Sequence, residues 1–217
     1  MPIFSIKTEE HKDLEDFFNK TIEELKVFFD IYPKGRRPSL TLVSDRKTIN
    51  ALRGGQTEPW VVGWFGGENV YVLCPENYEA ESDHKYSDEE YRALIKHELC
   101  HMFVLKICET NRNAGPLWIW EGTAIYVSGQ NRLKKPLSEF HAFIEQKDYI
   151  ADAKSLYYES GFAVGLLIEK FGKEKFLTML KNLKNLKSEE EFNAYFKELY
   201  GFELMLENFN NLLENRS

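Results

Sequence analysis

The segment His97-Glu98-Leu99-Cys100-His101 contains two histidines four residues apart, with a glutamate directly after the first. Residues four apart on a helix share one face, one turn from each other, so the two imidazoles can hold one metal ion. Glu98 points to the side of that face, where it can reach a metal-bound water without ligating the metal. In the other interpretation, this is an ordinary helix with two unrelated histidines. A third ligand decides between the two.

Glu121 is the best candidate for that third ligand, because it stands in the otherwise apolar segment 116–126. A carboxylate is costly to bury there unless it is paired or coordinated. The other candidates are His141, interpreted as a surface residue, and the cysteines, of which Cys100 projects from a different part of the helix. Two histidines and one glutamate leave a fourth position for water, as in catalytic zinc sites. We therefore expect one zinc ion per chain, held by His97, His101 and Glu121.

These motifs resemble the gluzincin metallopeptidases, in which HExxH gives two ligands and a glutamate on the next long helix gives the third. The segment Tyr158-Glu159-Ser160-Gly161-Phe162-Ala163 is similar to the Tyr-Glu-Lys-Gly-Phe-Ala segment of the aminopeptidase N and leukotriene hydrolase group. The tyrosine of that group donates its hydroxyl to the tetrahedral oxyanion, which implies this catalytic role for Tyr158. Ser160 replaces the usual lysine, and Tyr157 is the alternative. Both tyrosines could instead be core aromatics.

A weaker match is Gly66-Gly67-Glu68-Asn69, which is similar to the Gly-x-Met-Glu-Asn strand of the same aminopeptidases. The glutamate of that strand holds the free amine of the substrate. The central methionine is missing here, and a β-turn with Glu68 and Asn69 at its rim is the other interpretation. In either case we expect a strand over Asn69–Cys74 at the edge of the sheet beside the metal, where an extended peptide could add as an extra strand.

The resemblance implies a zinc-dependent metallopeptidase, a hydrolase whose substrate is a peptide or protein. Glu98 is expected to be the general base that accepts a proton from the attacking water. Tyr158 and the metal are expected to share the developing oxyanion. The alternative function is a non-catalytic metal-binding or regulatory module on a peptidase scaffold. The sequence does not distinguish aminopeptidase from endopeptidase action, and it does not determine the oligomeric state.

Apolar periodicity, β-forming residues and capping signals predict the elements that must position these residues. Strands are expected over 39–44, from residue 60 to about 66, and over 68–74. Helices are expected over 8–29, 45–52, 87–106, 117–128, 137–144, 155–171, 173–183, 188–200 and 202–213. This order predicts an α+β protein with the zincin (thermolysin-like) fold. We expect a small mixed sheet with an edge strand over the metal-binding helix in residues 1–107, and an all-helical lobe in residues 108–217, together forming one catalytic unit.

The composition narrows the function classes further. The chain of 217 residues has 28 Lys and Arg against 35 Asp and Glu, a net charge of −7, so nucleic-acid binding is not expected. No run of apolar residues is long enough to span a membrane, and the first residues lack a signal-peptide pattern. Three cysteines without a CxxC pair suit a reducing compartment, so a cytoplasmic protein is expected. The four tryptophans are interpreted as packing residues.

Overall fold

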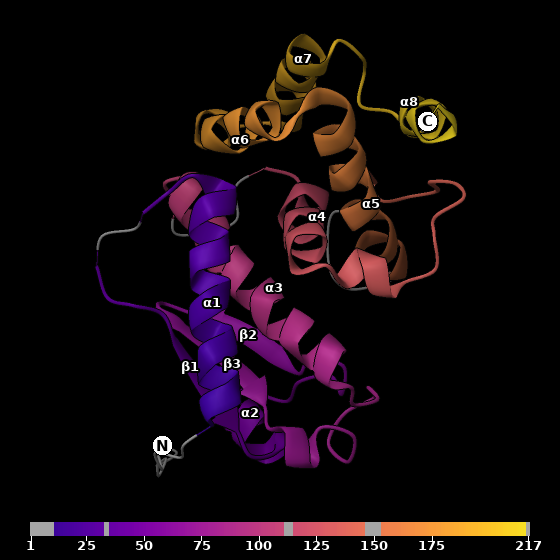
Figure 1. Cartoon of the computed structure of the whole chain (residues 1–217). Coiled ribbons are helices and arrows are strands. Elements are labelled where there is room, and N and C mark those ends of the chain that lie inside the picture. Colours follow the sequence, from indigo (N-terminus) through magenta and orange to yellow (C-terminus); the bar gives the residue numbers. More distant parts are fainter. Residues whose placement is uncertain (1–10, 33–34, 111–114, 146–152, 216–217) are drawn as a thin grey trace. The chain divides into compact units, whose positions relative to one another are not determined.

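The structure is a computed structural model that describes residues 11–32, 35–110, 115–145 and 153–215 (Figure 1). The chain divides into two compact units, Met1–Leu99 and Cys100–Ser217, and the division falls inside helix α3 (Asp88–Ile107). The sequence places the division at the end of this same helix, between residues 107 and 108. The described part of the first unit is mixed α and β, and that of the second is helical. An α+β protein is therefore confirmed.

The elements follow the predicted order closely. Those of the first unit, before α3, are α1 (Lys12–Phe29), β1 (Ser39–Val43), α2 (Arg46–Arg53), β2 (Gly63–Gly66), β3 (Asn69–Leu73) and the 3-10 helix η1 (Pro75–Asn77). Those after α3 are α4 (Leu117–Ser128), η2 (Gln130–Leu133), α5 (Ala153–Phe171), α6 (Lys173–Asn182), η3 (Leu183–Asn185), α7 (Glu189–Tyr200) and α8 (Leu206–Glu214). The last helix begins four positions later than expected, and residues 8–10 of the first expected helix lie outside the described residues.

Within the described residues, the sheet has three strands in the order β1-β3-β2. β1 runs parallel to β3, and β2 runs antiparallel to β3, so the predicted mixed sheet is confirmed. The tight turn between β2 and β3 passes through Gly67, whose φ of 60° is open to glycine at no steric cost. The expectation that Asn69–Cys74 forms an edge strand is wrong. β3 is the central strand, because β1 pairs with one side of it and β2 with the other, so β1 and β2 are the two edge strands of the described sheet.

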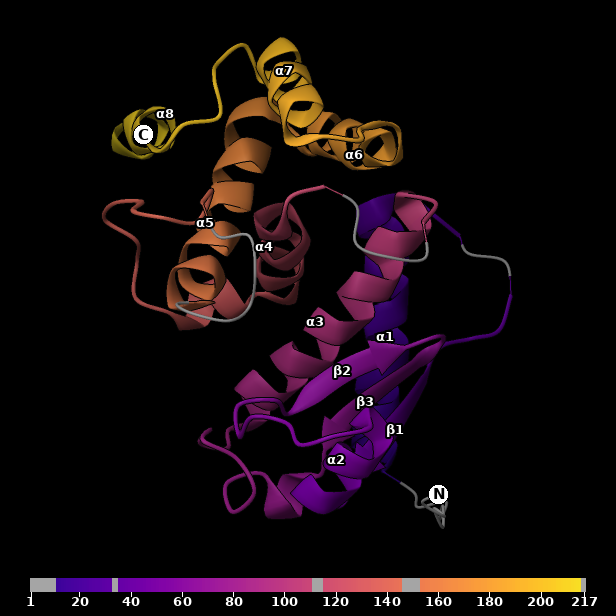
Figure 2. The ribbon, with the colours of Figure 1, turned by 180° about the vertical axis from the view of Figure 1, so that it is seen from behind.

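Two helices cover one face of this sheet. Figures 1 and 2 show α1 in front of the strands in one view and behind them in the other. Within the first unit, α1 is joined to α3 by an ion pair between Lys96 Nζ and Glu24 Oε2 at 2.6 Å, and the Arg92 guanidinium lies over the Phe17 ring. Alternate residues of β3, Val70 and Val72, are fully buried, as a strand covered on one face requires. This packing fixes the N-terminal part of α3 against the sheet.

Helix starts follow the capping signals in the sequence. The Asp45 carboxylate accepts the Thr48 backbone N–H at 2.7 Å and begins α2. The Ser87 hydroxyl accepts the Glu90 backbone N–H at 3.2 Å and so caps the start of α3. The helix that carries the two histidines therefore begins where local sequence chemistry places it.

The helix predicted over 137–144 is wrong. Residues 137–145 form irregular structure and a turn. Glu159 of α5 explains this, because its buried Oε2 accepts the backbone N–H groups of residues 141, 142 and 143 at 3.0–3.2 Å. Asn210 of α8 also accepts the Phe140 backbone N–H at 2.7 Å. Distant side chains thus satisfy amides that a helix would otherwise bond, and the apolar side chains of Phe140 and Phe143 are buried without helix formation.

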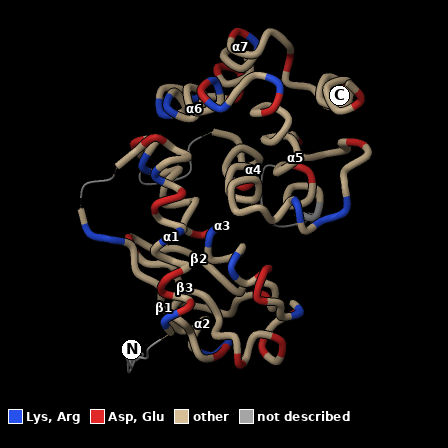
Figure 3. The backbone as a smooth tube through the Cα atoms, in the orientation of Figure 1, with Lys and Arg blue, Asp and Glu red and all other residues tan. Residues whose placement is uncertain are grey.

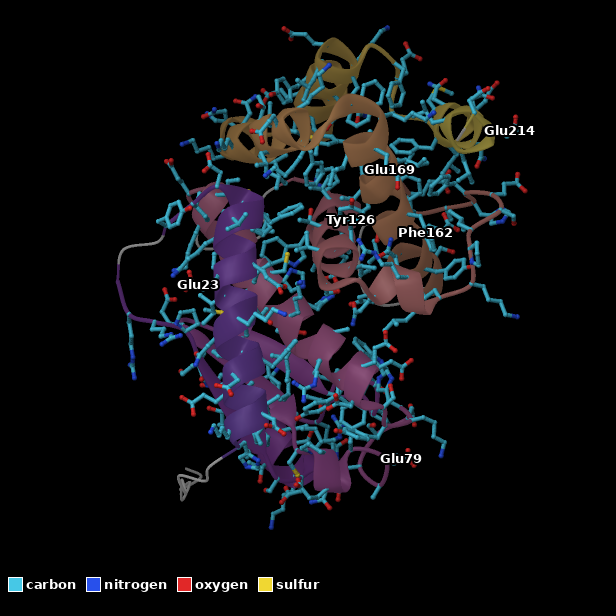
Figure 4. All side chains as sticks on the ribbon, viewed as in Figure 1. Glu23, Glu79, Tyr126, Phe162, Glu169 and Glu214 are labelled. Atoms are coloured by element: carbon cyan, nitrogen blue, oxygen red, sulfur yellow. The ribbon has the colours of Figure 1, made fainter. Side chains whose placement is uncertain are left out.

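Helices α4 and α5 pack closely because glycines lie where they meet. A Cβ placed on Gly122 would lie 2.5 Å from the Ser160 carbonyl oxygen, and one on Gly161 would lie 2.4 Å from Ile125 Cγ2. A Cβ on Gly165 would lie 3.1 Å from the ring of Tyr126, which is labelled on α4 in Figure 4. The two helices therefore approach at a distance that only glycine allows, and this contact holds α4 in place.

Replacing Gly122 by alanine is expected to lower the free energy of unfolding by about 1–3 kcal/mol. Alanine in a helix interior normally gains about 0.5–1 kcal/mol over glycine, but here the added methyl group meets a backbone carbonyl that cannot move away easily. Urea denaturation of the two proteins measures the difference. Gly55→Ala is the matched control, because a Cβ at Gly55 has no atom within 4 Å. If both variants are as stable as the original chain, the close approach at Gly122 is not a constraint.

Candidate metal centre

His97 and His101 lie one turn apart in the middle of α3, where the helix is buried. Only 6% of His97 and 4% of His101 is exposed. Both histidines belong to one continuous helix, so their relative position follows from helix geometry alone. The predicted arrangement of two imidazoles on one helical face is therefore present.

Helix α4 brings Glu121 to the same place. Figure 3 shows how few charges this helix carries, and Glu121 is the one charged residue in its sequence. Only 3% of this residue is exposed. Glu121 Oε2 lies 3.7 Å from His101 Nε2, which is too long for a hydrogen bond but close to the spacing of two atoms that share a cation. Burying this carboxylate is costly unless it has a partner, and the His101 imidazole beside it could bind the same ion.

The three residues form one group. One ligand atom from each of His97, His101 and Glu121 lies within 4.8 Å of the other two, and all three side chains are buried. Zinc bonds of about 2.0–2.1 Å in a tetrahedral arrangement put ligand atoms about 3.4 Å apart, so small side-chain adjustments would close the group around an ion. The donor set of two imidazoles and one carboxylate suits zinc, and other divalent transition metals also accept it. A metal ion could therefore be held here, as predicted.

Glu98 lies beside the first histidine and is also buried, with 8% exposed. Gly63, the first residue of the edge strand β2, faces it: a Cβ on Gly63 would lie 3.4 Å from Glu98 Cγ and 3.1 Å from Leu94 Cδ1. Both residues belong to the first compact unit. The edge strand and the candidate base are therefore direct neighbours, and the missing side chain of Gly63 leaves room for that approach.

Tyr158 lies on α5, with its hydroxyl donating a 3.0 Å hydrogen bond to the Lys135 carbonyl and its ring packed edge-to-face on Phe162. Three residues correspond to about 300° of rotation, so Tyr158 lies about 60° around the helix from Gly161, which meets α4. Tyr157 lies one turn before Gly161, about 40° from it around the helix. Helix position alone therefore does not separate the two tyrosines, and the oxyanion role of Tyr158 stays a prediction.

Lys134 contacts the same turn of α5. Its amino group donates to the Tyr157 carbonyl, and burial lowers the pKa of Lys134 to about 8. Desolvation penalises the charged amine, so near neutral pH a larger fraction of Lys134 is deprotonated than of a surface lysine. The part of α5 around Tyr157 is therefore held by this lysine.

The remaining candidates lie elsewhere. His141 is exposed, as predicted for a surface residue. Cys100 is buried on α3 but is not part of the three-residue group. Glu68 lies in the turn between β2 and β3, and Asn69 is the first residue of β3. This matches the interpretation of the segment as a β-turn with both residues at its rim. Burial raises the pKa of Cys108 to about 12, so its thiol, which donates to the Leu180 carbonyl, is a poor metal ligand at neutral pH.

Two neighbours of the site do not follow from the motifs in the sequence. Trp120 stacks flat on the His101 ring with 4.5 Å between the ring centroids, whereas it was interpreted only as a packing residue. The other is Gly63, which stands inside a run of β-forming residues. Its position inside that run was a usable signal, because glycine within a strand often marks a close approach by another element. Among the other tryptophans, Trp118 is buried, while Trp60 is 45% exposed and does not pack in the core.

Comparisons with known proteins add no assignment. No family model matches the chain, and no curated protein or solved structure matches it significantly. Within the described residues, no helix has both the length and the apolar character needed to cross a bilayer. What can be said about function therefore comes from the residues of the metal centre and their surroundings.

Proposed function

We propose that the protein is a zinc-dependent metallopeptidase of the gluzincin type that hydrolyses peptide bonds. The observation that carries this proposal is the buried group of His97, His101 and Glu121 with Glu98 in the same helical turn. Structural zinc sites usually have four protein ligands, whereas three protein ligands leave a position for water or substrate. The mixed sheet, the central helix with both histidines and the helices that follow are also compatible with the zincin fold that the resemblance implies.

Each residue has a separate task in this proposal. When bound, zinc would polarise the substrate carbonyl and make water a nucleophile at neutral pH. Glu98 accepts the proton of the attacking water and later donates it to the leaving amine. His97, His101 and Glu121 hold the ion and do not exchange protons with the substrate. Glu98 and Glu121 are therefore two buried carboxylates with different roles, one as base and one as ligand.

Strand β2 supports a peptide as the substrate. It is the last strand on its side of the described sheet, so its outer backbone groups can pair with an added extended chain. Gly63 at its start lies close to Glu98, because a Cβ placed on this glycine would be 3.4 Å from Glu98 Cγ. A peptide that paired with β2 would run past the residue that handles the proton. Main-chain pairing of this kind favours peptides or unfolded protein segments as substrates over small esters or amides.

The tyrosine that stabilises the oxyanion is tested by replacing each candidate with phenylalanine. Tyr158→Phe is expected to lower kcat for peptide hydrolysis by about 10²-fold or more, because one oxyanion donor is worth about that much. Tyr157→Phe is expected to leave kcat near its original value. The opposite result would assign the role to Tyr157. If both variants hydrolyse peptides as fast as the original chain, neither tyrosine stabilises the oxyanion.

The proposal itself is tested by metal analysis combined with digestion of a broad peptide library at neutral pH. We expect about one zinc ion per chain, cleavage of library peptides, loss of cleavage after treatment with a chelator, and recovery when zinc is added back. Zinc at one per chain without cleavage of any peptide would instead favour the non-catalytic metal-binding module. A chain that binds no divalent metal would refute both functions.

A further inference from the structure

The indole ring of Trp120 lies flat against the imidazole ring of His101. The ring centroids are 4.5 Å apart and the ring planes differ by 10°. Only 3% of Trp120 is exposed, so the indole has little space in which to move. Both residues belong to the second compact unit. A buried, parallel stack of this kind constrains the orientation of both rings.

Ring orientation matters because a ligand nitrogen must point at its metal. The terminal torsion of a histidine side chain has broad energy wells, so rotamer preference alone does not fix the plane of the imidazole. Tilting the His101 ring would require the buried indole to move with it. Trp120 directly precedes Glu121, so helix α4 provides both one ligand and the surface on which another ligand rests.

We propose that Trp120 is a positioning residue for the metal ligand His101. Its indole holds the imidazole plane so that Nε2 stays directed toward Glu121 Oε2, 3.7 Å away. Metal binding then requires less reorganisation of the ligands, which raises affinity. The inference rests on the metal site of the proposed function, but it does not depend on peptide hydrolysis.

Trp118 provides a matched control on the same helix. It is 1% exposed and packs edge-to-face on Phe143 and Phe209, with ring centroids 5.1 and 5.9 Å away. Two residues apart on an α-helix correspond to about 200° of rotation, so Trp118 faces away from the side on which Trp120 lies. A Trp118 variant loses aromatic packing of similar extent but leaves the stack on His101 intact.

The first experiment measures zinc affinity by competition with a chromogenic chelator in Trp120→Leu, Trp120→Phe and Trp118→Phe. Trp120→Leu is expected to weaken zinc binding by about 10-fold or more, the usual effect of losing a group that orients a metal ligand. Trp120→Phe restores a flat ring and should recover most of that loss, while Trp118→Phe should keep the original affinity. Unchanged affinity in Trp120→Leu, or an equal loss in Trp118→Phe, would overturn the inference.

The second experiment does not require the leucine variant to fold. Copper(II) bound at the histidines quenches the fluorescence of a tryptophan in contact with them. Quenching by one equivalent of Cu²⁺ should be largely lost in Trp120→Phe and kept in Trp118→Phe. Quenching that persists fully in Trp120→Phe would contradict the stack. If the original chain binds neither zinc nor copper, the proposed function fails as well. If it binds zinc and Trp120→Leu binds it equally well, this inference alone fails.

Discussion

The Glu98→Gln variant is expected to retain its zinc and to lose peptide hydrolysis by a factor of about 10²–10⁴. This loss corresponds to about 3–5 kcal/mol of transition-state stabilisation. Glutamine has nearly the same shape as glutamate, so it fits in the same space beside Gly63. It cannot accept a proton near neutral pH, so only the proposed general base is removed. Because Glu98 is not one of the three grouped ligands, zinc content should stay at one per chain.

Glu89→Gln is the matched control for this prediction. It is the same substitution in the same helix, at an exposed position in the first turn of α3. We expect no change in hydrolysis or in zinc content. Initial rates on one cleaved peptide, together with metal analysis of each protein, measure both effects. Full activity in Glu98→Gln would refute the role of Glu98, and loss of zinc in that variant would show that the glutamate helps to hold the metal.

The grouping of His97, His101 and Glu121 was predictable because each step relied on a strong local signal. Two histidines at a spacing of four on a capped helix must share a face. A single carboxylate in an apolar helix must find a partner, because burying it alone is too costly. The first constraint concerns only the helix with the two histidines, and the second concerns only the helix with Glu121. A buried carboxylate near two histidines completes a metal site. No knowledge of the sheet or of the other helices was needed to expect the group.

Features that depend on tertiary contacts were not predictable in the same way. Apolar spacing over 137–144 favours a helix, but Glu159 from α5 takes the amide hydrogens that the helix would use. The strand over Asn69–Leu73 was expected, yet its central place depends on β1 pairing along its other side. The stack of Trp120 on His101 likewise joins two different helices. In each case the deciding partner is distant in sequence and leaves no local pattern.

Removing the third ligand is expected to abolish the stabilisation of the fold by zinc. A ligand that binds only the folded state adds about 4 kcal/mol when its free concentration is about 1,000 times Kd. For a chain of this size that is a rise in Tm of about 8–16 °C. In Glu121→Gln the neutral amide is a much weaker zinc ligand than a carboxylate, so adding zinc should produce little or no rise. Melting curves with zinc and with chelator measure this shift in both proteins.

Glu159→Gln is the matched control, because it changes a buried glutamate that is not one of the three grouped ligands. Glu159 is as buried as Glu121, at 2% against 3% exposed, but its carboxylate binds backbone amides of residues 141–143. Losing its charge should lower stability by about 1.5–3 kcal/mol with and without zinc, because hydrogen bonds to a charged group are weakened. The rise in Tm with zinc should remain. If Glu121→Gln keeps the full zinc-dependent rise, Glu121 does not bind the ion, and the two histidines of α3 would have to hold it without this carboxylate.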